Sequence, residues 1–256
     1  MRTALVTGAA RRIGREISLA LAEDGWNVAL CIRHNRPDQD STDLVREIEA
    51  KGVRAVVLPA DLRDAAAVEK LVPDAAAALG PLSLLVNNAS VFEPDQAATM
   101  TYESWTDHMD VNLRAPAFLA RAFNAQIPRD GGNIVNIIDQ RVWRPNPLFF
   151  SYTMSKMALW DMTRLMAQAY APRIRVNGVG PGPTLASTHQ SPEDFAREAE
   201  ATILKRGTSP QEICAAIRFI LASPAMTGQM IALDGGQHLA WETPDVIAGT
   251  LPTPKK

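Results

Sequence analysis

Short apolar runs alternate along the chain with longer segments in which apolar residues recur every three or four positions. The short runs are rich in Val, Ile and Leu, as buried strands are, and lie at 4–6, 27–32, 54–58, 82–86, 133–138, 173–179 and 230–233. The longer segments predict helices, the main ones at 13–25, 41–50, 64–79, 102–127, 150–170 and 213–221. This alternation predicts an α/β protein with a doubly wound parallel sheet.

No internal repeat or linker interrupts the alternation, so we expect a single domain over residues 1–256. Ligands of doubly wound sheets bind at the carboxyl ends of the strands. Residues 185–207 follow a predicted strand, are polar, and include a short helix predicted from Pro192, which is typical of a substrate lid. Residues 242–256 are rich in Pro and Thr, and we expect this tail either to be mobile or to pack on another subunit.

The composition is that of an ordinary globular protein, with 46% hydrophobic residues and a net charge of −2. Charges of one sign form no long run, so neither nucleic acid nor a membrane surface is an expected partner. Cys31 and Cys214 lie in apolar segments and predict buried thiols, without a disulfide or metal framework. The first strand begins at the N-terminus, which leaves no room for a signal peptide, and no apolar run is long enough to span a membrane. We therefore expect a cytoplasmic protein.

Candidate chemistry begins at the turn after the first strand, which reads TGAARRIG at 7–14. A glycine-containing turn between a strand and a helix is where the helix N-terminus holds a phosphate. Arg12 stands where a middle glycine often lies, and no Lys-Ser/Thr pair follows, so the turn is neither GxGxxG nor a P-loop. An ordinary glycine turn is the alternative.

The end of the second strand discriminates between the nicotinamide cofactors. Sites for NAD place an acidic residue about 20 positions after the glycine turn, where it binds the ribose hydroxyls. Here the region reads Arg33-His34-Asn35-Arg36, and the first acidic residue is Asp38. Arg12 and Arg36 would pair with the 2′-phosphate of NADPH, which a carboxylate would repel. We predict NADPH; a solvated basic strand end is the alternative.

Tyr152 and Lys156 are four residues apart and lie on one face of the predicted 150–170 helix. An ammonium near a phenol lowers the phenol pKa, so such a tyrosine can transfer a proton near neutral pH. Asp139 ends the preceding strand and is expected to point at the same place. An ordinary Tyr–Lys pair on a helix surface is the alternative. The candidate residues gather at strand ends: Gly8, Arg36, Asp61, Asn88 and Asp139.

A proline interrupts the predicted 102–127 helix. Pro116 predicts a kink or a local loosening of this helix, and Asn112 lies in the turn before it.

These motifs together resemble the short-chain dehydrogenase/reductase family over residues 3–238. The motifs are TGAARRIG at 7–14, Asp61-Leu62, NNAS at 87–90, Asn112, Tyr152-x-x-x-Lys156 and Gly180–Thr184. The resemblance implies a single-domain Rossmann fold with a seven-stranded sheet. It also implies a homodimer or homotetramer built on two long helices, here 102–127 and 150–170.

The resemblance assigns roles by position. Tyr152 would donate or accept the proton, Lys156 would hold the nicotinamide ribose and lower the Tyr152 pKa, and Asn112 would help to organise a water relay. The glycine turn would wrap the pyrophosphate, Asp61 and Leu62 would meet the adenine, and residues 181–184 would meet the nicotinamide. The implied cofactor-binding residues are Gly8, Arg11, Arg12, Ile13, Gly14, Asn35, Arg36, Asp61, Leu62, Asn88, Ala89, Ser90, Tyr152, Lys156, Pro181, Gly182 and Thr184.

One position departs from the general family pattern, which has Ser where this chain has Asp139. A carboxylate would repel a developing oxyanion, whereas it can accept N–H bonds from a nitrogen heterocycle or, with its pKa raised by burial, protonate a ring nitrogen. Asp139, Arg12, the NNAS motif and Phe92 resemble the pteridine reductase branch, in which the aromatic residue stacks on the pterin. Phe92 would do so here, with a core or lid aromatic as the alternative.

We therefore predict an NADPH-dependent short-chain reductase that reduces a pterin of the dihydrobiopterin, dihydromonapterin or dihydrofolate type. Phe92, Asp139 and Tyr152 are the predicted substrate contacts, and no metal is expected. One alternative is a short-chain reductase of another carbonyl or imine. The other is a non-catalytic NADP(H)-binding sensor, although such proteins tend to lose the tyrosine or lysine that this chain retains.

Overall fold

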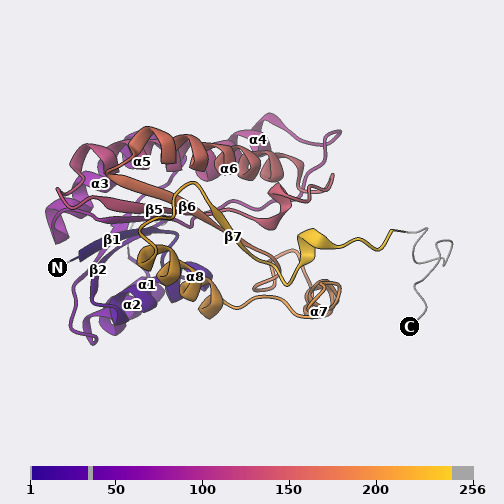
Figure 1. Cartoon of the computed structure of the whole chain (residues 1–256), viewed down its shortest axis with the longest axis horizontal. Helices are drawn as coiled ribbons and strands as arrows, with labels where there is room; N and C mark the ends of the chain where they lie inside the picture. Colours follow the sequence, from indigo (N-terminus) through magenta and orange to yellow (C-terminus); the bar gives the residue numbers. More distant parts are fainter. Residues whose placement is uncertain (1, 34–36, 244–256) are drawn as a thin grey trace.

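In the described part of this computed structural model, residues 2–33 and 37–243, seven parallel strands pair into one sheet (Figure 1). Their order across the sheet is β3-β2-β1-β4-β5-β6-β7. The predicted doubly wound sheet is confirmed, and every predicted strand is present with small shifts at its ends. The strands are β1 (Arg2–Thr7), β2 (Trp26–Ile32), β3 (Ala55–Pro59), β4 (Leu84–Asn87), β5 (Gly132–Ile137), β6 (Ile174–Pro181) and β7 (Met230–Leu233).

Helices cover both faces of the sheet. Figure 1 shows α3, α4, α5 and α6 above it and α1, α2 and α8 below it. The predicted helices are likewise present, and Asp64 caps α3 as a helix-start residue should, by accepting a bond from the Ala66 amide. The helices are α1 (Arg12–Glu23), α2 (Gln39–Glu49), α3 (Ala65–Leu79), α4 (Tyr102–Met109), α5 (Ala115–Gln126), α6 (Phe150–Tyr170), α7 (Pro192–Glu200) and α8 (Pro210–Ala222).

The two faces of the sheet bury two separate apolar cores. Leu5 of β1 packs with Leu85 in the core that includes α3 and α5, whereas its neighbour Val6 packs with Val86 in the core that includes α1 and α8. Successive side chains of a strand point to opposite faces. Because both faces are covered, the strands carry continuous apolar runs instead of alternating ones, and every residue of β2 is buried.

The strand order sets the position of the ligand crevice. From β1 the chain runs outward to β2 and β3, and it then returns to the opposite side of β1 with β4. At such a reversal the loops that follow the two central strands diverge and leave a crevice at their carboxyl ends. The turn after β1 and the NNAS segment after β4 therefore flank one crevice.

The 102–127 segment is not one regular α-helix, because a π-helical turn, Asp110–Arg114, joins α4 to α5. Pro116 has no N–H to donate to the carbonyl four residues earlier, which is that of Asn112, and its ring crowds that carbonyl. A π-helical turn accommodates this mismatch, and such turns occur often at functional sites. The predicted loosening is confirmed, and Asn112 lies inside it.

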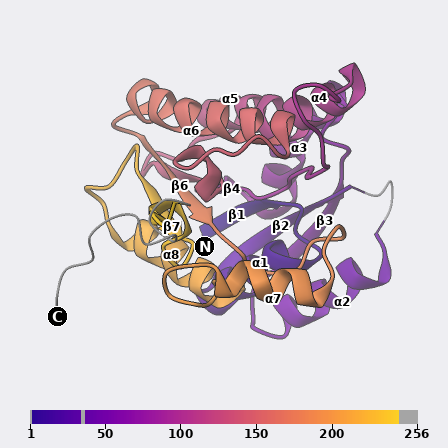
Figure 2. The ribbon, with the colours of Figure 1, turned by 90° about the vertical axis from the view of Figure 1, so that its right-hand side faces the viewer.

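The predicted lid segment contains α7, which begins at Pro192 as expected. Figure 2, turned so that the right-hand side of Figure 1 faces the viewer, has α7 in the foreground. Ser191 and Asp194 form a reciprocal capping box at its start. Within the described ranges, no helix combines the length and apolar character needed to cross a membrane.

Candidate active site

The loops at the carboxyl ends of the strands enclose a cavity of about 890 Å³. It is wide enough for a dinucleotide and a small heterocycle together, by comparison with ordinary ligand pockets. Among the described residues, every predicted cofactor or substrate contact lines it: Gly8, Arg11, Arg12, Ile13, Gly14, Asp61, Leu62, Asn88, Ala89, Ser90, Phe92, Asp139, Tyr152, Lys156, Pro181, Gly182 and Thr184. The predicted contacts Asn35 and Arg36 lie outside the described residues.

The turn after β1 needs both of its glycines. Gly8 has a φ of +63°, which side chains disfavour, and a Cβ added to Gly14 would lie 2.1 Å from the Gly8 oxygen. Asn88 braces this turn, because its Nδ2 donates to the carbonyl oxygens of Thr7 at 2.9 Å and Gly8 at 3.2 Å. The NNAS segment thereby fixes the glycine turn against the start of α1.

The N-terminus of α1 fits a phosphate. Its N-cap residue, Arg11, makes no side-chain capping bond, and the first turn contains no acidic residue. The free N–H groups and the positive end of the helix dipole are therefore left for an anion. By contrast, Ser191 and Ser209 cap α7 and α8 with their own hydroxyls.

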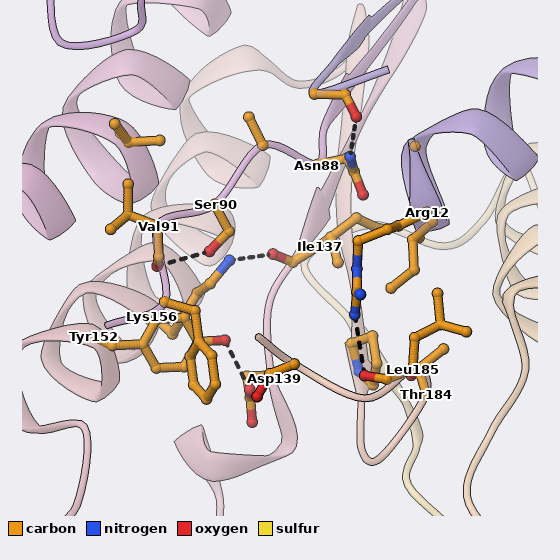
Figure 3. A pocket seen from close by; sticks show the side chains of 18 of the residues that line it. Arg12, Asn88, Ser90, Val91, Ile137, Asp139, Tyr152, Lys156, Thr184 and Leu185 are labelled. Atoms are coloured by element: carbon orange, nitrogen blue, oxygen red, sulfur yellow. Dashed lines mark hydrogen bonds between the residues drawn. The ribbon is translucent and has the colours of Figure 1, made fainter. Parts of the chain in front are cut away.

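The two arginines of the glycine turn have different partners. Arg11 pairs with Asp38 at 3.1 Å and with Asp40 at 2.5 Å. Arg12 donates to the carbonyl oxygens of Leu185 at 3.1 Å and Ala186 at 2.9 Å (Figure 3). Arg12 thereby holds the start of the predicted lid segment, and its predicted contact with a 2′-phosphate stays a prediction.

Residues after β3 form the side of the cavity that is predicted to meet the adenine. Asp61 accepts bonds from the Arg63 guanidinium, the shortest at 2.6 Å. This pairing lowers the Asp61 pKa and keeps the carboxylate ionised. Leu62 is 7% exposed and packs in the core beneath.

Tyr152, Asp139 and Lys156 meet at one wall of the cavity (Figure 3). The Tyr152 hydroxyl donates to Asp139 Oδ2 at 2.8 Å. Asp139 Oδ1 accepts from the Arg141 amide at 2.8 Å, which fixes the carboxyl group. Lys156 Nζ donates to the carbonyl oxygen of Ile137, the last residue of β5, also at 2.8 Å. The structure thus brings the three predicted groups together.

Burial removes Asp139, Tyr152 and Lys156 from water and so shifts the pKa of each group. Burial raises the Asp139 pKa, although Arg141 and its own hydrogen bonds oppose the shift. Burial lowers the Lys156 pKa to about 8. The prediction of a lowered Tyr152 pKa is wrong for this arrangement, because burial first and the Asp139 carboxyl second raise the Tyr152 pKa well above its ordinary value.

Asn112 lies behind the cavity wall. Its Oδ1 accepts from the Val91 amide at 2.8 Å and the Ser90 hydroxyl at 3.2 Å. Its Nδ2 donates to the Val91 carbonyl and to the Ser155 hydroxyl, both at 3.0 Å. The side chain therefore joins the loop after β4 to α6, and its predicted part in a water relay stays a prediction.

An aromatic pair, Phe92 and Phe149, lies beside the Tyr152 ring. The two phenyl rings stack with centroids 4.2 Å apart and planes 5° apart, and Phe92 meets Tyr152 edge-on at 4.7 Å. Sequence reasoning singled out Phe92 and missed Phe149. Phe149 precedes α6 in a left-handed conformation, with a φ of +54°. Such backbone strain in a residue other than glycine is concentrated at functional sites, but no sequence motif marks it.

Residues 185–207, the predicted lid segment, contact the opposite side of the cavity. His189 Nε2 lies 3.1 Å from Glu93 Oε2, and Glu93 belongs to the loop that carries Phe92. Gln190, Phe195 and Glu198 of the same segment also line the cavity. Arg12 at one side and Glu93 at the other therefore attach residues 185–189 to both parts of the site.

Comparison with known proteins agrees with this geometry. The sequence profile of the family described as enoyl-(acyl carrier protein) reductase matches residues 8–238. The chain is 31% identical over 244 residues to 3-oxoacyl-[acyl-carrier-protein] reductase FabG of Staphylococcus aureus, covering 93% of this chain and 98% of that protein.

Solved structures include closer relatives. FolM alternative dihydrofolate reductase 1 from Brucella suis, in complex with NADP, is 47% identical with a TM-score of 0.91, over 95% of this chain and 98% of that one. A blue fluorescent protein from a metagenomic library, in complex with NADPH, is 34% identical with a TM-score of 0.86, over 92% and 97% of the two chains.

The fold and the site define an oxidoreductase with a Rossmann sheet. The chain belongs to the short-chain dehydrogenase/reductase family.

Proposed function

We propose that this protein is an NADPH-dependent reductase of a pterin of the dihydrobiopterin, dihydromonapterin or dihydrofolate type. The observation that carries the proposal is the 2.8 Å hydrogen bond between the Tyr152 hydroxyl and Asp139. Burial raises the pKa of both groups, so this pair holds protons beside an aromatic wall. The 47% identity to a protein named an alternative dihydrofolate reductase supports the same substrate class.

The cofactor is held by residues of the strand ends. The N-terminus of α1 and the Gly8–Gly14 turn bind the pyrophosphate, Asp61 and Leu62 border the adenine, and residues 181–184 border the nicotinamide. Complexes of two similar proteins with NADP and NADPH support this choice of cofactor. When bound, NADPH supplies a hydride to the substrate.

The protein's own residues supply the proton and orient the substrate. Reduction of a C=N bond adds a hydride to carbon and a proton to nitrogen, and the proton comes from the Tyr152–Asp139 pair, directly or through a water. Asp139 also accepts N–H bonds from the heterocycle through a carboxyl oxygen. Lys156 binds the nicotinamide ribose while its charge is retained, and residues 185–207 act as the lid.

A substrate panel tests this function. Purified protein with NADPH should turn over reduced or oxidised pterins faster than small ketones and quinones. Turnover of ketones without turnover of any pterin would refute the pterin assignment.

The similarity to FabG favours a second candidate, a reductase of a carbonyl substrate. The Asp139→Ser variant separates the two, because a serine hydroxyl stabilises a developing oxyanion that the carboxylate repels. A gain in ketone reduction with loss of pterin reduction supports the pterin reductase. NADPH binding without turnover of any substrate in the panel would instead indicate a non-catalytic NADP(H)-binding protein.

We also propose a cytoplasmic homodimer or homotetramer that pairs through the α4–α5 segment and α6. Phe118 of α5 and Met154 and Leu165 of α6 are large apolar side chains that remain exposed in the single chain. Light scattering after size exclusion tests the assembly, and a monomer at micromolar concentration would refute it.

A further inference from the structure

Arg141, two residues after Asp139, places its charged guanidinium group at the cavity wall. It lies in the short 3₁₀ turn Gln140–Val142 and lines the cavity. Its guanidinium carbon lies 5.4 Å from the ring centroid of Phe92 and 5.0 Å from that of Phe149. The two rings therefore hold the planar guanidinium through cation–π contacts, which restricts its orientation.

One nitrogen of the guanidinium lacks an acceptor in the described part of the chain. Arg141 Nη1 is buried and has no hydrogen-bond partner among the residues that the structure describes. A buried charged donor without an acceptor is costly, so native structures usually supply one. The nearby carboxyl of Asp139 is already bonded to the Arg141 amide and the Tyr152 hydroxyl. Arg141 lines the cavity, so an acceptor for its guanidinium can arrive from that side.

We propose that Arg141 determines substrate specificity by donating from its guanidinium to an oxygen acceptor of the substrate. The proposal rests on the proposed function and specifies that the substrate must carry an oxygen acceptor for Arg141. Two oxygens of a pterin meet the requirement, the carbonyl oxygen of the ring and the carboxylate of a dihydrofolate-type side chain. Both accept from a guanidinium, and the carboxylate accepts two parallel bonds.

The test compares Arg141→Met with the unchanged protein. Methionine keeps apolar contact with the two phenyl rings and removes all five N–H donors. Arg141→Lys keeps the charge and loses the planar fork. Arg144→Met is the matched control, because Arg144 is exposed three residues further on and does not line the cavity. Thermal unfolding and NADPH binding verify that each variant is folded.

Two measurements detect the proposed contact between Arg141 and the substrate. Steady-state turnover at saturating NADPH compares dihydrofolate, which carries carboxylates, with dihydrobiopterin, which carries none. Fluorescence titration of the NADP-loaded protein compares binding of a 4-oxo pterin with that of a 2,4-diaminopteridine, in which an amino group replaces the ring carbonyl. A lost bond from a charged donor should raise KM or Kd about 10- to 100-fold with little change in kcat.

Each outcome has one meaning. Weaker use of both dihydropterins with unchanged diaminopteridine binding supports the ring carbonyl, and a loss confined to dihydrofolate supports the carboxylate. KM values within about threefold of the unchanged protein, or equal loss for diaminopteridine, overturn the Arg141 proposal while leaving the pterin function intact. If the unchanged protein neither binds nor reduces any pterin, the proposed function fails and the Arg141 proposal fails with it.

Discussion

Desolvation is the largest influence on each of the three ionisable groups at the cavity wall. It raises the pKa of Asp139 and of Tyr152, and it lowers the pKa of Lys156 to about 8. Charged neighbours modify these shifts without reversing them. Burial therefore shifts each group toward its neutral form, so Asp139 and Tyr152 retain their protons to higher pH than they would in water.

Replacing Asp139 by asparagine should separate catalysis from stability. The amide keeps the shape, its oxygen can accept from the Arg141 amide, and its nitrogen can donate to the Tyr152 hydroxyl. Pterin turnover should fall about 100-fold or more, because an acid–base group is lost. Because the pKa is raised, the folded state binds the Asp139 proton more tightly than the unfolded state does. The free energy of unfolding therefore decreases as pH rises from the unfolded pKa of this carboxyl through its folded pKa.

Asp139→Asn should therefore unfold at a higher temperature than the unchanged protein at pH 7, and the difference should shrink toward pH 4. Thermal scans at several pH values measure it. A lower unfolding temperature at pH 7 would contradict the burial argument.

Lys156 should limit activity on the alkaline side. Its charged form predominates below a pKa of about 8 and is lost above it, so kcat/KM for NADPH should fall as pH passes 8. The same shift makes folding stability rise between about 8 and the ordinary value of 10.5, because the unfolded chain binds the proton more tightly there. Initial rates from pH 6 to 10 give the profile. Lys156→Arg retains the charge, and its alkaline limb should move upward or disappear.

At the scale of elements, the lid segment and α1 are joined across the cavity by Arg12. Local sequence patterns predicted α1 and the start of α7, because each depends on neighbours a few residues apart. The bonds of Arg12 to Leu185 and Ala186 span 173 and 174 residues, and no local pattern encodes them.

Arg12→Met should loosen the lid. Two hydrogen bonds from a charged donor are lost, so amide exchange in residues 185–190 should become about tenfold faster or more in the free protein. Hydrogen exchange with mass spectrometry measures this directly. Arg11→Met is the control, since Arg11 pairs with Asp38 and Asp40 and not with the lid. Equal exchange in the two variants would show that Arg12 does not restrain the segment.

At the scale of the whole molecule, the fold brings functional residues that are far apart in the sequence to one edge of the sheet. The parallel order brings the turn after β1, the loop after β4 and the end of β5 to one cavity, with α6 supplying Tyr152 and Lys156. Because sequence identifies strands and their direction, it also predicted which loops would share this edge. The stacked Phe149 and the buried Arg141 guanidinium could not be predicted in this way.

NADPH should stabilise the whole fold more than NADH. A ligand that binds only the folded state adds about 2.7 kcal/mol at 100 times its Kd. The basic segment at 33–36 favours the 2′-phosphate, so the unfolding temperature should rise by several degrees more with NADPH than with NADH at equal concentration. Arg36→Asp should remove the difference. Equal shifts with both cofactors in the unchanged protein would refute the cofactor preference.

The sequence by itself determined the strands, the helices, the glycine turn and the Tyr152–Lys156 spacing, since these follow from residues close together in the chain. Only the tertiary structure decided what those residues do to one another. The Asp139–Tyr152 bond, the direction of the Tyr152 pKa and the attachment of Arg12 to the lid depend on burial and on contacts between distant segments. Burial strips water from a group according to everything packed around it, and local spacing carries no record of that environment.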